Sequence, residues 1–325
     1  MEGKALLPLQ PYRAPFWLPG GNLQTIYAVG LSRKLVACYR RERWELDDGD
    51  FLDLDWSDGP PDAPLVVLFH GLEGSSQSHY AKAMMRAVAR AGWRGVVAHF
   101  RGCGGEPNRL PRAYFAGDSA EIGRVLTRMR QEARRAPLFA VGVSLGGNAL
   151  LKWLGEEGGA AHAYLDRAAA VSVPLDLVTA GRRLDRGFNR VYTARFLRTL
   201  LPKARDRQRR FPGMLGAARL DDIATIFDFD ERVTAPLHGF AGALDYWRRA
   251  SCQSLLRGIR VPTLLVHAFN DPFLPGAYLP QRDELAPGVI LDLSAQGGHV
   301  GFVNGPFPGN LEWLPRRILG YFSDR

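Results

Sequence analysis

Unbroken apolar runs alternate along the chain with segments that repeat apolar residues every three or four positions. Residues 63–71, "APLVVLFHG", form a continuous apolar run between Pro and Gly, which is typical of a strand buried on both faces. Residues 80–91 show helical spacing and stop at Gly92, a favoured helix C-cap. Similar patterns predict strands at 93–100, 137–143, 167–175, 261–269 and 288–294, and helices at 122–133, 145–155 and 313–322. This order predicts an α/β fold, with helices on both faces of a mostly parallel central sheet.

Two segments depart from the strand and helix alternation. Residues 40–46 and 50–56 flank the turn Asp47-Asp48-Gly49 and predict a β-hairpin. The region of approximately 175–260 is rich in Arg, shows only short helical patterns and contains no strong strand signal. We therefore expect a single domain over residues 1–325 that carries an inserted helical lid at about 175–260.

Composition and charge are those of an ordinary globular protein, with 46% hydrophobic and 23% charged residues. The formal net charge is +9, but the Arg residues are scattered, so we do not expect a nucleic-acid partner. The densest basic run, "PKARDRQRR" at 202–210, is predicted to be a solvated face. A basic lid would also suit peripheral contact with an anionic membrane surface.

Cysteine spacing and the N-terminus bear on compartment and cofactors. Cys38, Cys103 and Cys252 lie too far apart for a zinc or redox motif, and we expect neither a metal nor a cofactor. The N-terminus lacks the pattern of a signal peptide, and no apolar run reaches the roughly 18 residues of a membrane span. We expect a cytoplasmic protein, and the oligomeric state is left open.

The segment "GVSLG" at 142–146 matches G-x-S-x-G between a predicted strand and a predicted helix. In that context a serine occupies a sharp, strained turn that only glycine neighbours allow. Ser144 is therefore the candidate nucleophile. The spacing excludes the G-x-G-x-x-G dinucleotide pattern, while an inert glycine turn stays as the structural alternative.

A serine nucleophile needs a base and an acid that orients the base, and in α/β sheets these follow in the order Ser, Asp, His. Asp271 comes directly after one late strand, and His299 lies on a glycine loop after the next. Asp271 alone would more simply be a turn-former before Pro272. The order of all three residues favours a catalytic triad.

The oxyanion would need two backbone donors. Leu145, at the start of the helix, is one; "HGLEGSS" after the buried strand supplies the other, which we assign to Leu72 with Glu73 as the fallback. His70 is expected to shape this turn and His79 to line the pocket. The remaining histidines, His99, His162, His238 and His267, are predicted to be structural or surface residues.

These motifs resemble the YheT-like branch of the α/β-hydrolase superfamily, a group of bacterial α/β-fold hydrolases identified as esterases. The resemblance runs through nearly the entire chain in family order, with its most specific part from Thr234 to Ser251. The matching segments are "PGGNLQTIY", "HGLEGSSQSHY", "FRGCGGEPN", "GVSLGGNALLKWLGEEG", "VTAPLHGFAGALDYWRRAS", "FNDPFLP" and "GGHVGF". One departure is Asn22, where the branch often has His.

The resemblance implies an α/β-hydrolase fold with a helical lid and the triad Ser144, Asp271 and His299. We expect a serine esterase that cleaves a small-molecule or lipid-like carboxylic ester through an acyl-enzyme. An acyltransferase using the same triad is one alternative, weakened because Asn304 stands where the transferase pattern has Asp. A hydrolase-fold protein that only binds a ligand or partner is the other. Four lid aromatics, Phe227, Phe229, Phe240 and Trp247, either line an acyl pocket or pack the lid.

Overall fold

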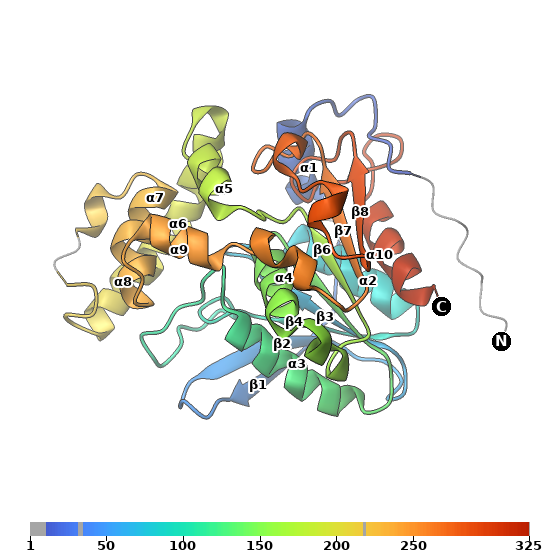
Figure 1. Cartoon of the computed structure of the whole chain (residues 1–325), viewed down its shortest axis with the longest axis horizontal. Helices are drawn as coiled ribbons and strands as arrows, with labels where there is room; N and C mark the ends of the chain where they lie inside the picture. The colour runs from blue at the N-terminus through green and yellow to red at the C-terminus, as the bar shows by residue number, and fades with distance from the viewer. Residues whose placement is uncertain (1–10, 32–34, 217–218, 325) are drawn as a thin grey trace.

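Eight strands form one sheet in the computed structural model, which describes residues 11–31, 35–216 and 219–324 (Figure 1). Their spatial order is β1-β2-β4-β3-β5-β6-β7-β8. β2 is antiparallel to both of its neighbours, and every other pairing is parallel. The strands are β1 Arg40–Glu45, β2 Phe51–Ser57, β3 Leu65–Phe69, β4 Arg94–Ala98, β5 Leu138–Val143, β6 Arg167–Val171, β7 Thr263–Ala268 and β8 Val289–Ser294. The predicted α/β class, the mostly parallel sheet and the hairpin are confirmed.

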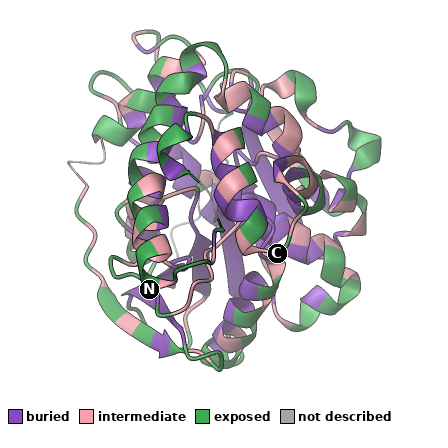
Figure 2. Ribbon diagram, turned by 90° about the vertical axis from the view of Figure 1, so that its left-hand side faces the viewer, coloured by how far each residue is buried: buried purple, intermediate pink, exposed green. Residues whose placement is uncertain are grey.

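Helices cover both faces of the sheet because alternate strand residues point to opposite sides. In β3, Leu65, Val67 and Phe69 pack with helices α3 and α4, whereas Val66 and Leu68 pack with α2 and α10. Figure 2 shows the strands in the buried colour, with exposed residues on the outer sides of the helices. These helices are α2 His79–Arg90, α3 Ser119–Ala133, α4 Leu145–Glu157 and α10 Trp313–Ser323, with α1 Gly21–Leu31 near the N-terminus.

The segment between β6 and β7, residues 172–262, is helical in its described part and is called the cap below. It lies to one side of the sheet, at the left of Figure 1. Its helices are α5 Leu177–Leu184, α6 Arg190–Arg210, α7 Ile226–Phe229, α8 Ala235–Leu237 and α9 Ala243–Ala250, with the shorter turns η3 Gly187–Asn189, η4 Leu220–Asp222, the π-helical η5 Asp230–Thr234, and η6 Gln253–Gly258. Outside the cap, the short helices are η2 Gly158–Ala163, η7 Gly276–Tyr278 and η8 Arg282–Glu284.

The basic run 202–210 forms the second half of α6, and the prediction that it is a solvated face is wrong in part. Ala204 is buried, and Lys203 and Arg207 line a cavity between the cap and the sheet. An α-helix presents every third or fourth residue to the same side, so one basic helix has a wet face and a cavity face. Within the described residues, every helix falls short of the length and apolar character that crossing a membrane requires.

Candidate active site

Ser144 occupies the sharp turn between β5 and α4. Its φ of 53° and ψ of −119° form a conformation that costs an L-residue about 1–3 kcal/mol. The flanking glycines make room for the turn: a Cβ on Gly142 would meet Gly147 Cα at 2.6 Å, and one on Gly146 would meet the His70 carbonyl oxygen at 2.4 Å. The turn therefore requires glycine on both sides of the serine.

The structure brings Ser144, His299 and Asp271 into one chain of hydrogen bonds, although they are far apart in sequence. Ser144 Oγ lies 3.0 Å from His299 Nε2, and His299 Nδ1 lies 2.9 Å from Asp271 Oδ2. The Phe273 ring stacks obliquely on the imidazole, with ring centroids 4.1 Å apart. This packing and the Asp271 contact hold the imidazole ring in line with the serine hydroxyl.

Asp271 is fully buried, and its surroundings favour the ionised carboxylate. Burial alone would raise its pKa, but attraction to His299, the hydrogen bond from His299 and the field of His267 lower the pKa overall. Its second oxygen, Oδ1, accepts from the backbone N–H groups of Phe273, at 2.8 Å, and Leu274, at 3.4 Å. Since an ionised carboxylate only accepts, His299 Nδ1 carries the proton and Nε2 is left to accept from Ser144.

The loop that carries His299 is fastened by the N-terminal helix α1, a contact that sequence reasoning missed. The Thr25 hydroxyl accepts from the His299 backbone N–H at 2.8 Å. Gln24, which is completely buried, accepts from the Asn270 side chain at 3.0 Å and from the Gly297 N–H at 2.9 Å. The segment "PGGNLQTIY" thus connects the loops of Asp271 and His299, and its family resemblance was the available signal.

His70 shapes the turn after β3, as predicted. Its Nε2 accepts from the Phe100 N–H at 3.1 Å, and its Nδ1 lies 2.8 Å from the Gly71 carbonyl oxygen. Burial lowers the pKa of His70 to about 3, so the ring is neutral at physiological pH and accepts and donates one hydrogen bond each.

The two backbone donors proposed for an oxyanion both border the cavity at Ser144. Neither the Leu72 nor the Leu145 N–H has an acceptor within the described residues, and Leu145 opens a helix, where N–H groups lack intrahelical partners. The Glu73 N–H, the fallback donor, donates instead to the Tyr114 hydroxyl oxygen at 2.9 Å. The Glu73 N–H is therefore already used in a hydrogen bond to Tyr114, and this contact stabilises the turn.

A largely apolar cavity opens at Ser144 between the cap and the sheet, with about 1150 Å³ of empty space including its mouth. Of the four cap aromatics considered from sequence, Phe229 and Trp247 line it. Phe227 packs on Trp247 at the surface, and Phe240 packs against Phe115 and Tyr246. Two of the four aromatics therefore line the cavity, and the other two pack the cap. Other apolar lining residues are Leu72, Ala116, Leu145, Leu177, Leu184, Phe196, Leu200, Ile226, Val233, Leu237 and Phe273.

One histidine expectation is wrong, and a second histidine has a position that was not expected. His79 does not border this cavity; it lies behind the His299 loop, where its Nε2 is 2.9 Å from the Val300 carbonyl oxygen. His238, expected to be structural or on the surface, lines the cavity. Local sequence could not reveal either, because both positions depend on how the cap and the loops meet the sheet.

The contacts of three other histidines and the burial of Cys103 give these residues no catalytic role. His99 contacts Asp55, His267 lies 3.1 Å from the Ala268 carbonyl oxygen, and His162 is exposed. Burial raises the pKa of the Cys103 thiol to about 12, which disfavours a reactive thiolate. Within the described residues, no cluster of three or more His, Cys, Asp or Glu side chains could hold a metal ion.

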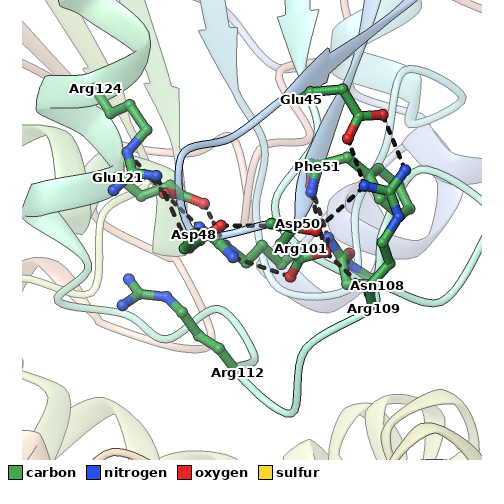
Figure 3. Close-up of polar contacts among 12 residues, drawn as sticks. Glu45, Asp48, Asp50, Phe51, Arg101, Asn108, Arg109, Arg112, Glu121 and Arg124 are labelled. Carbon is green, nitrogen blue, oxygen red and sulfur yellow. Dashed lines mark hydrogen bonds and ion pairs between the residues drawn. The ribbon is translucent and has the colours of Figure 1, made fainter.

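A buried ionic network fixes the loop after β4, beside the cavity (Figure 3). Arg101 is 2% exposed and lies among three carboxylates, at 2.7 Å from Glu121, 2.9 Å from Asp50 and 2.8 Å from Asp48. Asp50 also accepts from the Asn108 side chain at 2.8 Å. The charge of Arg101 is therefore satisfied within the protein, and its role is to hold the loop 100–108 in place.

Comparison with known proteins agrees with this architecture. The family model described as alpha/beta hydrolase fold matches residues 64–306, which include β3 to β8, the cap and all three residues of the hydrogen-bonded chain. The chain belongs to the α/β-hydrolase family.

Individual relatives narrow the placement. The Escherichia coli (strain K12) protein named "Putative esterase YheT" is 42% identical over 307 residues, covering 93% of this chain and 90% of that protein. "Phospholipase ABHD3" of Mus musculus is 29% identical over 317 residues, covering 94% and 77%. A solved esterase from Exiguobacterium antarcticum superposes with a TM-score of 0.55 at 16% identity, covering 88% of this chain and 100% of that one. The predicted YheT-like branch is confirmed.

Proposed function

We propose that the protein is a serine hydrolase that cleaves carboxylic esters with apolar acyl groups through an acyl-enzyme intermediate. The observation that carries the proposal is the hydrogen-bonded chain from Ser144 through His299 to Asp271 at the edge of an apolar cavity. A positioned base beside a strained serine is the arrangement that activates a hydroxyl for attack on a carbonyl carbon. Relatives named esterase and phospholipase support ester cleavage.

In the first half-reaction, His299 Nε2 takes the Ser144 proton while Oγ forms a bond to the ester carbonyl carbon. The carbonyl electrons move to its oxygen, and the Leu72 and Leu145 N–H groups stabilise that negative charge. The carbonyl then re-forms, the bond to the alcohol oxygen breaks, and His299 returns its proton to the leaving alcohol. Asp271 stabilises the imidazolium throughout.

In the second half-reaction, water replaces the alcohol. His299 removes a proton from water, the hydroxyl oxygen attacks the acyl carbon, and the bond to Ser144 Oγ breaks as the serine regains a proton from His299. The acid leaves and the enzyme is restored. Atoms and charges balance with the ester and water alone, so the reaction as written consumes no cofactor.

The cap supports an apolar substrate. Its helices bring Phe229, Trp247, Leu200 and Ile226 to the cavity opposite Ser144, and contact with such side chains would remove an acyl chain from water. We propose that the cap acts as the lid of the site. Its exposed residues include Phe188 and several arginines, which suits peripheral contact with a lipid surface.

The test is Ser144→Ala assayed on p-nitrophenyl esters of increasing chain length, together with labelling by a fluorophosphonate probe. Removing the nucleophile should lower kcat by about 10⁴-fold or more and abolish labelling. Ser254→Ala, at an exposed position in η6, is the matched control and should leave both unchanged. Hydrolysis by Ser144→Ala at the wild-type rate would refute the mechanism. Ester formation with an added alcohol that outpaces hydrolysis would reassign the enzyme as an acyltransferase.

A further inference from the structure

The cavity is lined mainly by apolar side chains, and basic side chains of the cap helix α6 form part of one wall. Most charged groups around it already have partners inside the protein. Lys203 Nζ lies 2.7 Å from the Glu73 carboxylate, and Arg101 is surrounded by carboxylates. Asp230 accepts from the Trp247 indole at 2.7 Å and from the Thr234 hydroxyl at 2.6 Å. Such internal pairing leaves these groups little capacity to bind a ligand charge.

Arg207 is the exception on this wall. It lies one helical turn after Lys203 on α6, and the end of its side chain lies against Gly102. No carboxylate of the described residues is within ion-pair distance of its guanidinium. Burial and the nearby Arg210 charge lower its pKa, and attraction by Asp206 and Glu73 does not offset them. Arginine nevertheless stays charged in proteins, so the cavity holds a partly desolvated cation that has no direct ion-pair partner among the described residues.

His238 is a second polar group at this cavity whose hydrogen-bonding capacity is not used within the protein. Its Nε2 is buried and has no hydrogen-bond partner among the described residues, and its ring stacks obliquely on Phe115 with centroids 4.5 Å apart. Burial, then the charges of Arg112 and Arg207, lower the pKa of His238 to about 4, so the ring is neutral and retains one N–H donor. Buried polar atoms in native proteins normally have a partner.

Arg112, which precedes the cavity-lining Ala113, adds a second positive charge near His238. One guanidinium nitrogen lies 2.7 Å from Asp118, while the Arg112 Nε is buried and has no partner in the described part of the chain. Figure 3 shows Arg112 apart from the carboxylates around Arg101. The field of Arg112 acts on His238 together with that of Arg207, so positive potential from two different elements meets at this imidazole.

We propose that Arg207 and His238 form a subsite that binds a phosphate group carried by the ester substrate. A guanidinium fork and a neutral N–H donor suit an anion with several acceptor oxygens, and a phosphate offers three or more. The inference rests on the proposed ester hydrolysis at Ser144. It adds a chemical class to the substrate: an acyl ester whose other part carries a phosphate.

The test compares two substrates that share one acyl chain, a monoacylglycerol and the same monoacylglycerol bearing a 3-phosphate. Release of the fatty acid is measured below the concentration at which either aggregates. Wild-type protein should favour the phosphate ester in kcat/KM by about tenfold or more. In Arg207→Gln or His238→Phe, that preference should fall to a ratio near one, a loss of about tenfold or more, as expected when hydrogen bonds to a charged group are removed.

Arg209→Gln is the matched control, since it removes the same charge from an exposed position two residues along α6. It should keep the wild-type preference. A wild-type ratio near one, or a preference that survives in Arg207→Gln, would overturn the subsite. Inhibition by inorganic phosphate without preference for the phosphate ester would show a site for the free anion, which also overturns it.

Two further measurements separate the possible failures. Dodecyl phosphate should inhibit wild-type hydrolysis of the neutral ester more strongly than dodecanol, and this test needs no variant to fold. Equal inhibition by the two would contradict the subsite. If wild-type protein hydrolyses the neutral ester through Ser144 but ignores the phosphate, only the subsite is wrong. If Ser144→Ala is still active, the proposed function itself has failed.

Discussion

Replacing Asp271 by Asn is the sharpest perturbation of the candidate triad, because the structure fixes how the new amide must sit. Asp271 Oδ1 accepts from two backbone N–H groups, at 2.8 and 3.4 Å. The amide oxygen of Asn must stay at that position, since its NH₂ group there would face two donors. The NH₂ group is then placed 2.9 Å from His299 Nδ1, where Asp271 Oδ2 now lies.

That placement reverses the tautomer of His299. Facing a donor, Nδ1 must lose its proton and accept, so the proton moves to Nε2, which can then no longer accept from Ser144. Nothing else in the site needs to move. A wrong tautomer with intact geometry lowers kcat by about 10⁴-fold in serine hydrolases of this type, equivalent to about 5.4 kcal/mol of barrier.

The assay is steady-state hydrolysis of a p-nitrophenyl ester, with the free energy of unfolding measured by urea titration of the same preparations. Asp271→Asn should retain its fold, within about 1 kcal/mol of wild type, because the isosteric amide keeps both backbone hydrogen bonds. Asp221→Asn, at a cap carboxylate whose side chain is 87% exposed, is the control and should keep full activity. A folded Asp271→Asn with more than a tenth of wild-type kcat would refute the tautomer argument.

The sequence was sufficient to predict the sheet and the hydrogen-bonded chain because their signals are local. Buried parallel strands appear as continuous apolar runs, and Ser144 lies in a five-residue pattern that demands a particular turn. Asp271 and His299 each lie on the loop that follows a strand. The carboxyl ends of parallel strands meet at one edge of a sheet, so order along the chain was enough to bring these three residues together.

The wall of the cavity could not be predicted, because it depends on how the cap is docked. Ala204 of α6 is buried, but the side on which Lys203 and Arg207 face a cavity is set by contacts with the loops after β3 and β4. His238 is similar, since its position follows from packing on Phe115 of another loop. Periodicity tells which residues share a face and not what that face meets.

The N-terminal segment shows a second kind of limit. Its motif was visible only as a family resemblance. The physical reason for the motif is tertiary: Gln24 and Thr25 supply hydrogen bonds to loops more than 240 residues away in sequence. A polar side chain that satisfies distant backbone groups leaves no periodic trace in the sequence around it.

Three further variants test the glycine turn at Ser144, the hydrogen bond to the His299 loop and the buried carboxylate of Asp230. Gly146→Ala should lower the free energy of unfolding, measured by urea titration, by about 1–3 kcal/mol and should lose most activity. The reason is that its Cβ would lie 2.4 Å from a backbone oxygen. Gly159→Ala, with open space around the position, should keep wild-type stability and activity. If the two variants lost stability and activity to the same extent, the steric argument would be wrong. Thr25→Val should lower kcat about tenfold and stability by about 1–3 kcal/mol, because the His299 N–H loses its 2.8 Å acceptor; an unchanged kcat would refute this positioning role. Asp230 is buried, and burial raises its pKa to about 6 from 3.8, so its ionisation weakens folding progressively as pH rises from about 4 to 6. Asp230→Asn should therefore gain stability relative to wild type over that window, on the order of 3 kcal/mol by pH 7. If the difference in urea midpoint between variant and wild type is the same at pH 4 and pH 7, this explanation is wrong.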